Sequence, residues 1–221
     1  LFTLGMLLLY RLGTFVPIPG FDPGAYASIF ESQSGGLLGN MNMFAGGAVE
    51  RMGIFALNVM PYITASIIIQ MMTQASPTLE KLKKEGEAGR KQINQYTRYL
   101  TLAFALVQSF AISSGLSHVR IDGIAGPFFI LTGVVTLTGG TMLLMWMGEQ
   151  ITARGVGNGI SLIIFAGIVA ELPKAVVNLI SNEGYSEGQV AFVAGILLMA
   201  IAIIVFIVFM ERSQRRILIQ Y

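Results

Sequence analysis

The chain has 221 residues, of which 54% are hydrophobic and only 12% are charged, and its formal net charge is +2. Soluble domains carry about 25% charged residues, so this composition excludes an ordinary soluble domain and predicts an all-α polytopic membrane protein. The chain contains no cysteine, which excludes disulfides, thiolate metal sites and cysteine nucleophiles within it. Its single histidine, His118, cannot form a multi-histidine metal site.

Uncharged runs between charged residues predict six membrane spans, judged against a hydrocarbon core of about 30 Å. Because the chain starts at Leu1 inside an apolar run, we expect it to be part of a longer protein. The fifth run is the weakest, since Glu171, Pro173 and Lys174 in its second half predict an early exit or a tail that runs along the membrane interface. In chain order the predicted spans are 1–18, 53–75, 99–116, 127–148, 159–179 and 189–210.

Arg11 lies inside the first predicted span. An arginine at the centre of a membrane helix costs about 2.5 to 3.5 kcal/mol on insertion scales. Two interpretations follow. In the first, Arg11 lies in the outer half of the span and its guanidinium reaches the lipid headgroups. In the second, it faces a cavity and has a function there.

The stretch that follows the first span predicts a chain that folds back into the membrane. Residues 17–20 read PIPG and predict a rigid extended turn. Residues 37–47 are apolar and rich in glycine but too short to cross, which indicates a re-entrant piece. The uncharged run that comes next is interrupted by polar residues such as Asn58 and Gln70 and by Pro61. This pattern favours either a pore or binding site, or a helix buried in a bundle.

Lysine and arginine lie mostly on one side of the predicted spans. Alternation of the spans puts ten of these residues on one side and three on the other. The positive-inside rule therefore places the first side, and both chain ends, in the cytoplasm. The larger set comprises Lys81, Lys83, Lys84, Arg90, Lys91, Arg98, Arg154, Arg212, Arg215 and Arg216, and the smaller set Arg51, Arg120 and Lys174.

Two connections on the cytoplasmic side carry recognisable patterns. The loop 77–98 has six basic and three acidic residues, and it is either an ordinary positive-inside loop or a docking surface for an acidic partner. The loop before the fifth span contains Gly155, Gly157 and Gly159, but no strand precedes it and no lysine of a phosphate loop follows. We expect a tight turn there, with Asn158 or Ser161 capping the next helix.

The chain shows no catalytic arrangement. It has no HExxH or GxSxG motif, no serine with a nearby base inside a span, and no aspartate within any predicted span. We therefore expect no enzyme activity, no cofactor and no metal site. The alternative class is a secondary transporter, which would need a substrate or coupling-ion site that is not visible in the spans. A structural scaffold would not need a re-entrant piece.

Seven sequence blocks together resemble the bacterial SecY family, the large subunit of the Sec protein translocase. They are spread over the chain in the family's order, so the resemblance covers the whole length. The blocks are FVPIPG (15–20), NMFAGG (42–47), IFALNVMPYITASIIIQ (54–70), KKEGEAGR (83–90), QYTR (95–98), GEQIT (148–152) and GVGNGIS (155–161).

The resemblance implies a fold and a division of the chain. It implies the first six of ten spans and a short re-entrant plug helix at about 37–51. Residues 1–182 would form the N-terminal half of the channel with spans one to five. Residues 183–221 would hold the external hinge loop, the sixth span and the start of a cytoplasmic loop. The implied function is that of the central pore-forming subunit of a protein-conducting channel, for secretion across the membrane and insertion into it.

The resemblance also implies roles for single residues. Val59, Ile63 and Ile164 correspond to this half's share of an aliphatic pore ring, where isoleucine was expected in place of Val59. Thr64 and Gln108 resemble members of the polar cluster at the lateral gate, which recognises signal sequences. The residues that correspond to the plug are Asn42, Met43, Phe44, Ala45, Gly46 and Gly47.

Partners and location follow from the same resemblance. The family implies SecE and SecG subunits, signal sequences, nascent polypeptides and the lipid bilayer as partners. It also implies a multi-pass protein of the bacterial inner membrane with a cytoplasmic N-terminus. The SecA motor or a translating ribosome would dock on a set of basic residues. That set is Lys83, Lys84, Arg90, Lys91, Arg98, Arg212, Arg215 and Arg216.

Overall fold

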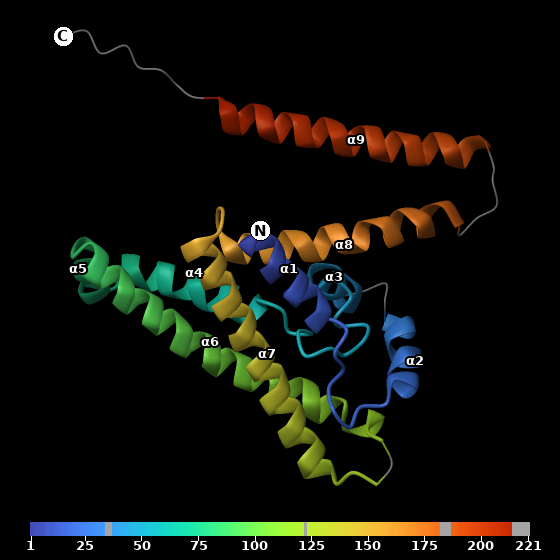
Figure 1. Ribbon diagram of the computed structural model, residues 1–221, viewed down its shortest axis with the longest axis horizontal. Helices are drawn as coiled ribbons and strands as arrows, with labels where there is room; N and C mark the ends of the chain where they lie inside the picture. The colour runs from blue at the N-terminus through green and yellow to red at the C-terminus, as the bar shows by residue number, and fades with distance from the viewer. Residues whose placement is uncertain (34–36, 122, 182–186, 214–221) are drawn as a thin grey trace. The chain divides into compact units, whose positions relative to one another are not determined.

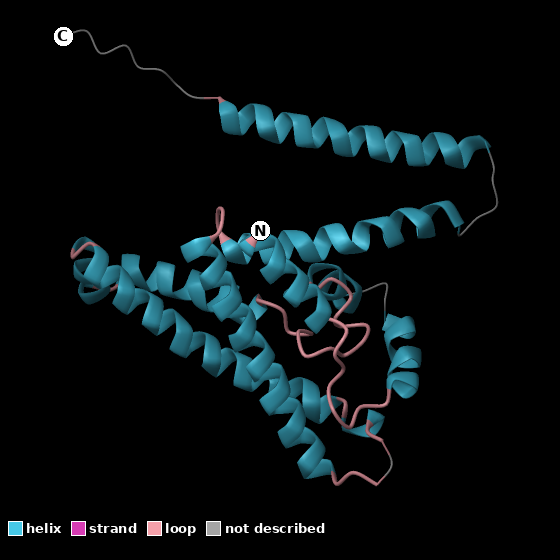
Figure 2. Cartoon of the chain, in the orientation of Figure 1, coloured by secondary structure: helices cyan, strands magenta, loops and turns pink. Residues whose placement is uncertain are grey.

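The computed structural model describes residues 1–33, 37–121, 123–181 and 187–213 (Figure 1). Within these ranges the chain is mostly helical, and its β-type pairing is limited to two isolated bridges, Pro17 with Gly53 and Phe21 with Arg120 (Figure 2). The helices are α1 (Phe2–Gly13), α2 (Pro23–Gln33), α3 (Leu37–Phe44), α4 (Met60–Ala75), α5 (Pro77–Lys84), α6 (Glu87–Gly115), the 3₁₀ turn η1 (Ser117–Val119), α7 (Gly126–Arg154), α8 (Gly159–Ser181) and α9 (Glu187–Arg212).

The contacts divide the chain into two units, Leu1–Glu171 and Leu172–Tyr221. In the first unit α6 packs against both α4 and α7, and α1 packs against α7. The short helix α5 packs on α4 and α6. The second unit consists of the end of α8 and all of α9. The functional division predicted between residues 182 and 183 differs from this boundary and stays a prediction.

Three helices in the described ranges are long and apolar enough to cross a membrane, namely Gly126–Arg154, Gly159–Val177 and Ala194–Arg212. They coincide with the fourth, fifth and sixth predicted spans. Helix α1 is apolar but has only 12 residues. The first three predicted spans therefore stay predictions.

The second predicted span begins later than expected. Residues 53–59 form turns, and α4 begins only at Met60. The prediction that helix starts at residue 53 was wrong because Pro61 lies in the first turn of α4, where its missing N–H leaves no bond unmade. Just before α4, Met52 and Asn58 have left-handed backbone conformations, with φ of 44° and 49°. A right-handed α-helix cannot include these conformations, so the helix cannot begin before residue 59.

The first predicted span ends earlier than expected. Helix α1 stops at Gly13, residues 14 and 15 form a turn, and residues 16–18 leave it as non-helical chain rather than continuing as helix to residue 18. The reason is tertiary: this stretch pairs with the backbone near Gly53, as the bridge from Pro17 shows. A helix here would leave the Met52 carbonyl oxygen and the Ile54 N–H of the inner stretch without these backbone partners.

The loop predicted at 77–98 is mostly helix. Helix α5 covers Pro77–Lys84, and α6 begins at Glu87, so it includes the second half of the loop and the third predicted span. Only Glu85 and Gly86 separate the two helices. Gly86 has a φ of 75°, which favours glycine at this break, whereas Gly89 lies buried in the first turn of α6.

The turn before α8 was predicted correctly. The Oδ1 atom of Asn158 accepts hydrogen bonds from the backbone N–H groups of Ile160 at 3.1 Å and Ser161 at 3.3 Å. This is the N-cap geometry that satisfies otherwise unpaired donors at a helix start. Gly157, with a φ of 71°, makes the reversal just before the cap.

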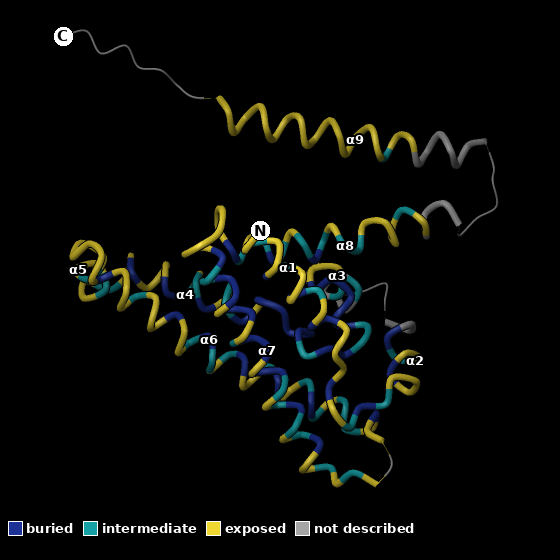
Figure 3. The backbone as a smooth tube through the Cα atoms, viewed as in Figure 1, coloured by how far each residue is buried: buried dark blue, intermediate teal, exposed yellow. Residues whose placement is uncertain are grey.

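The hydrophobic core of the first unit is built around a non-helical stretch. Eight apolar residues between 45 and 59 are buried, and they pack with Tyr10 of α1, Leu137 and Leu144 of α7, and Ile163 of α8 (Figure 3). Irregular backbone at membrane depth is tolerated only where protein buries it. The buried members of the stretch are Ala45, Ala48, Val49, Met52, Phe55, Ala56, Leu57 and Val59.

Candidate functional site

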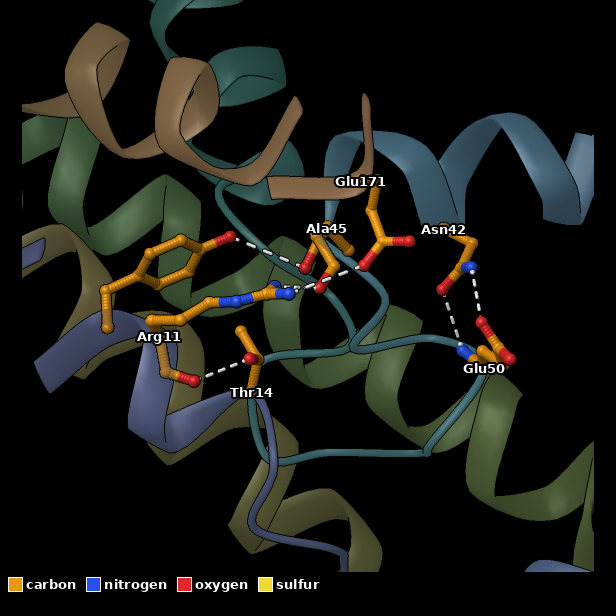
Figure 4. Close-up of polar contacts among 8 residues, drawn as sticks. Arg11, Thr14, Asn42, Ala45, Glu50 and Glu171 are labelled. Atoms are coloured by element: carbon orange, nitrogen blue, oxygen red, sulfur yellow. Dashed lines mark hydrogen bonds and ion pairs between the residues drawn. The ribbon is translucent and has the colours of Figure 1, made fainter. Parts of the chain in front are cut away.

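The candidate site is the inner segment, which we define as residues 42–59. It runs from the last turn of α3 to the residue that caps α4, and it contains the six single residues predicted for the plug, 42–47. Of the plug helix predicted at about 37–51, only α3, Leu37–Phe44, is helical, and its role stays a prediction. Figure 4 shows it lying beside the end of α1 and against α8. Three sets of contacts hold it there, one of backbone groups, one of close glycine contacts and one of charged side chains.

The first set is a short backbone pairing with the extended chain after α1. The N–H of Ile18 donates to the carbonyl oxygen of Met52 at 3.0 Å, and the N–H of Ile54 donates to that of Val16 at 2.9 Å. The Pro-rich stretch at 17–20 therefore provides a paired edge for the inner segment. This pairing satisfies polar groups that would otherwise be buried unpaired.

The second set depends on glycine at the contact with α8. A Cβ at Gly167 would lie 2.9 Å from both the Phe44 carbonyl oxygen and the Tyr10 hydroxyl. A Cβ at Gly46 would lie 3.1 Å from the Gly167 Cα, and Gly46 has a φ of 62°. Tyr10 completes the contact by donating a long hydrogen bond of 3.4 Å to the Ala45 carbonyl oxygen. The backbones meet so closely because neither glycine has a side chain.

The third set is charged and centres on Arg11. Its Nη1 donates to the carbonyl oxygen of Gly46, and its Nη2 lies 3.6 Å from Oε1 of Glu171 on α8 (Figure 4). The Arg11 side chain is 29% exposed and that of Glu171 only 12%. Arg11 therefore contacts protein groups on the inner segment and α8, and the interpretation that it faces a cavity and has a function there stays a prediction.

A second guanidinium lies close to this pair. The Cζ atoms of Arg51 and Arg11 lie 4.3 Å and 5.3 Å from the centre of the Phe15 ring, within the range of cation–π attraction. The Nη1 of Arg51 is buried and makes no hydrogen bond within the described residues. The guanidiniums of Arg11 and Arg51 therefore both lie near the Phe15 ring, and only that of Arg11 is paired with Glu171 in the described residues.

Two asparagines brace the inner segment from within. Asn42 accepts a hydrogen bond from the N–H of Glu50 at 2.8 Å and donates one to its carboxylate at 3.3 Å (Figure 4). The Nδ2 of Asn58 donates to the carbonyl oxygen of Phe44 at 2.6 Å. These bonds close the segment into a loop whose ends lie together.

The residues predicted for the pore ring are only partly gathered. Val59 is fully buried in the core, and Ile164 packs against that core from α8. The N–H of Ile63 donates to the Val59 carbonyl oxygen at 3.0 Å, so the two residues are one helical turn apart, and Ile63 is half-buried. Their common role as a ring stays a prediction.

The two predicted gate residues lie on neighbouring helices. Thr64 is exposed on α4, where its hydroxyl donates to the Met60 carbonyl oxygen of the same helix at 3.1 Å. Gln108 is half-buried on α6, which packs along α4. The helices are adjacent as a gate wall requires, and the polar cluster itself stays a prediction.

The predicted docking residues occupy several helices. Lys83 and Lys84 lie on α5, Arg90, Lys91 and Arg98 on α6, and Arg212 at the end of α9. Two of the lysines make exposed pairs within their own helices, Lys84 with Glu80 at 2.7 Å and Lys91 with Glu87 at 3.9 Å. Arg215 and Arg216 lie outside the described residues.

Arg98 has a structural partner that sequence reasoning missed. Its Nε and Nη2 donate to the two carboxylate oxygens of Glu149 on α7 at 2.8 Å and 2.6 Å. This bidentate pair joins α6 to α7 beside a polar cavity of about 340 Å³ that Tyr62, Asn94 and Thr152 also line. Arg98 lies in the block QYTR and Glu149 in the block GEQIT, and membership of these blocks was the only sequence signal that the two residues matter.

Comparison with known proteins identifies the family. The SecY family model matches residues 53–221. This chain belongs to the SecY family. It is 51% identical over its whole length to the protein translocase subunit SecY of Vibrio cholerae and to that of Escherichia coli K12, and 50% identical over 97% of its length to that of Pseudomonas aeruginosa.

The SecY relatives are longer than this chain. It spans 50%, 51% and 49% of the Vibrio, Escherichia and Pseudomonas proteins, about half the length of the curated relatives it matches. These relatives confirm the resemblance found in the seven sequence blocks. They give no support to the alternative of a secondary transporter.

Proposed function

We propose that this SecY chain supplies the N-terminal half of the central pore-forming subunit of a protein-conducting channel, for secretion across the membrane and insertion into it. The observation that carries the proposal is 51% identity along the whole chain to proteins named as SecY translocase subunits. The buried inner segment adds physical support, because a chain that folds back between helices suits a seal better than a plain span does.

The proposed mechanism assigns the inner segment to sealing. Residues 42–47 act as the plug, and their small size at Ala45, Gly46 and Gly47 lets them fit between α1 and α8. Val59, Ile63 and Ile164 act as the aliphatic ring around a moving chain. Branched apolar side chains close around many sequences by shape, and an apolar constriction also resists ions by dewetting. Helices α4 and α6, with Thr64 and Gln108, form one wall of the lateral gate.

The proposal extends to location and partners. The chain lies in the bacterial inner membrane with a cytoplasmic N-terminus and six spans. The inner segment overlaps the start of the second span. The chain acts with SecE and SecG subunits, and it serves as a channel rather than as an enzyme. SecA or a ribosome docks on the basic residues of α5 and α6 and on Arg212, Arg215 and Arg216, where long-range attraction favours acidic partners.

Site-specific photocrosslinking tests the proposal in the full-length protein. A photoreactive residue replaces Ile63, and a matched control replaces Leu131 of α7, which is 62% exposed. A stalled secretory chain is the target. We expect adducts at Ile63 and none at Leu131. Equal adducts at both positions, or none at Ile63, would overturn the pore assignment.

A further inference from the structure

The carboxylate of Glu171 lies where α8, α1 and the inner segment meet. Glu171 is the last residue of the first unit, and its carboxylate pairs with Arg11, which lies 160 positions earlier in the sequence. It also borders the inner segment itself, because a Cβ added at Gly47 would lie 2.6 Å from its Oε1. Gly47 has a φ of 78°, a backbone conformation that favours glycine.

We propose that Arg11 and Glu171 form an ionic lock that keeps the inner segment in place. The inference rests on the proposed function, in which this segment is the plug. Arg11 acts as a bridge, since one of its nitrogens is bonded to the Gly46 carbonyl oxygen while another faces the carboxylate. Both are positioning residues, which hold the seal and do not touch the moving chain.

The carboxylate is the more important half of the lock. It is almost buried, and a partly buried guanidinium that loses its counter-charge is strongly destabilised. Arg51 also lies near Gly47, with its Nη1 and Nη2 each 3.3 Å from the position of a Gly47 Cβ. Removal of Arg11 leaves Arg51 as a cation near this carboxylate, whereas removal of the Glu171 charge leaves both guanidiniums without it.

Hydrogen exchange in the full-length protein tests the lock directly. In Glu171→Gln we expect the amides of residues 46–54 to exchange about tenfold faster, the size of a typical coupling between sites. Arg11→Gln should give a smaller increase. Glu149→Gln is the matched control, because it breaks a comparable ion pair away from the inner segment and should leave these amides unchanged. Unchanged exchange in Glu171→Gln overturns the lock.

Ion conductance of the reconstituted protein without a translocating chain links the lock to function. Glu171→Gln should raise the resting conductance, and Glu171→Asp, which keeps the charge, should restore most of the seal. Faster exchange with unchanged conductance would keep the lock but overturn the role of the segment as plug. If Glu171→Gln does not accumulate, Arg11→Gln removes the other charge of the pair, and wild-type exchange in that variant overturns the lock.

Discussion

The side-chain amide of Asn58 donates a 2.6 Å hydrogen bond to the carbonyl oxygen of Phe44, and this contact ties the start of α4 to the end of α3. Asn58 is 3% exposed and has a left-handed φ of 49°. Asparagine tolerates this conformation better than most residues do. One residue therefore makes both the turn and the bond that close the inner segment.

Substitution of Asn58 separates these two contributions. Asn58→Gly keeps the turn and loses the bond, so we expect a loss of about 1 kcal/mol in the free energy of unfolding. Asn58→Ala also forces a Cβ into the left-handed region and should lose about 2 to 3 kcal/mol. Thermal unfolding of the full-length protein in detergent measures both. Equal losses would show that the backbone conformation contributes nothing.

Gly167→Ala should disturb the contact between α8 and the inner segment. The new Cβ would lie 2.9 Å from the Phe44 carbonyl oxygen, which is backbone and cannot move aside cheaply, so we expect a loss of about 1 to 3 kcal/mol. Gly139→Ala on α7 is the control, since a Cβ there meets nothing within 4 Å. That variant should gain up to about 1 kcal/mol from helix propensity. Similar stabilities of the two variants would contradict the close packing.

The Arg98–Glu149 pair should show measurable coupling. In a double-mutant cycle with alanine at each position, we expect a coupling of about 1 kcal/mol, because the geometry is bidentate but the side chains are 49% and 31% exposed. The pair Lys91–Glu87, which is far more exposed, is the control and should give about 0.3 kcal/mol. Additive effects at Arg98 and Glu149 would leave Arg98 as a docking residue alone.

The burial of Tyr26 in α2 predicts that the free energy of unfolding falls at alkaline pH. Burial raises the pKa of Tyr26 from 10.0 to about 12, so its neutral form is favoured in the folded state. The folded state then holds a proton that the unfolded state has lost, and stability falls as the pH rises from about 10 to about 12. The loss should approach 2 to 3 kcal/mol at the upper end.

The variant Tyr26→Phe isolates this effect. It keeps the ring contacts with Phe21 and Phe30, whose centres lie 5.1 Å and 6.0 Å away, but it cannot ionise. Unfolding free energies measured between pH 9 and pH 12 should therefore fall less steeply for the variant than for the unaltered protein. Parallel curves would place the titration on other groups.

The ends of the helices show where prediction from sequence failed. The late start of α4 had a local signal, since proline prefers the first turn of a helix and Pro61 could have marked that start. The early end of α1 had the signal of Pro17 and Pro19, but nothing local indicated that residues 16–18 pair with the inner segment. Hydropathy locates apolar runs but contains no information on which backbone groups will meet.

The sequence by itself determined the class of protein, the family and the three most apolar spans. Composition, hydropathy and the order of motifs can be read from the sequence without knowing which segments contact each other. Only the tertiary structure decided which groups Arg11 contacts. Its partners, Gly46 and Glu171, are 35 and 160 residues away, and no periodicity links them. Pairing of a buried charge depends on which segments the fold brings together, so it is settled by packing and not by spacing.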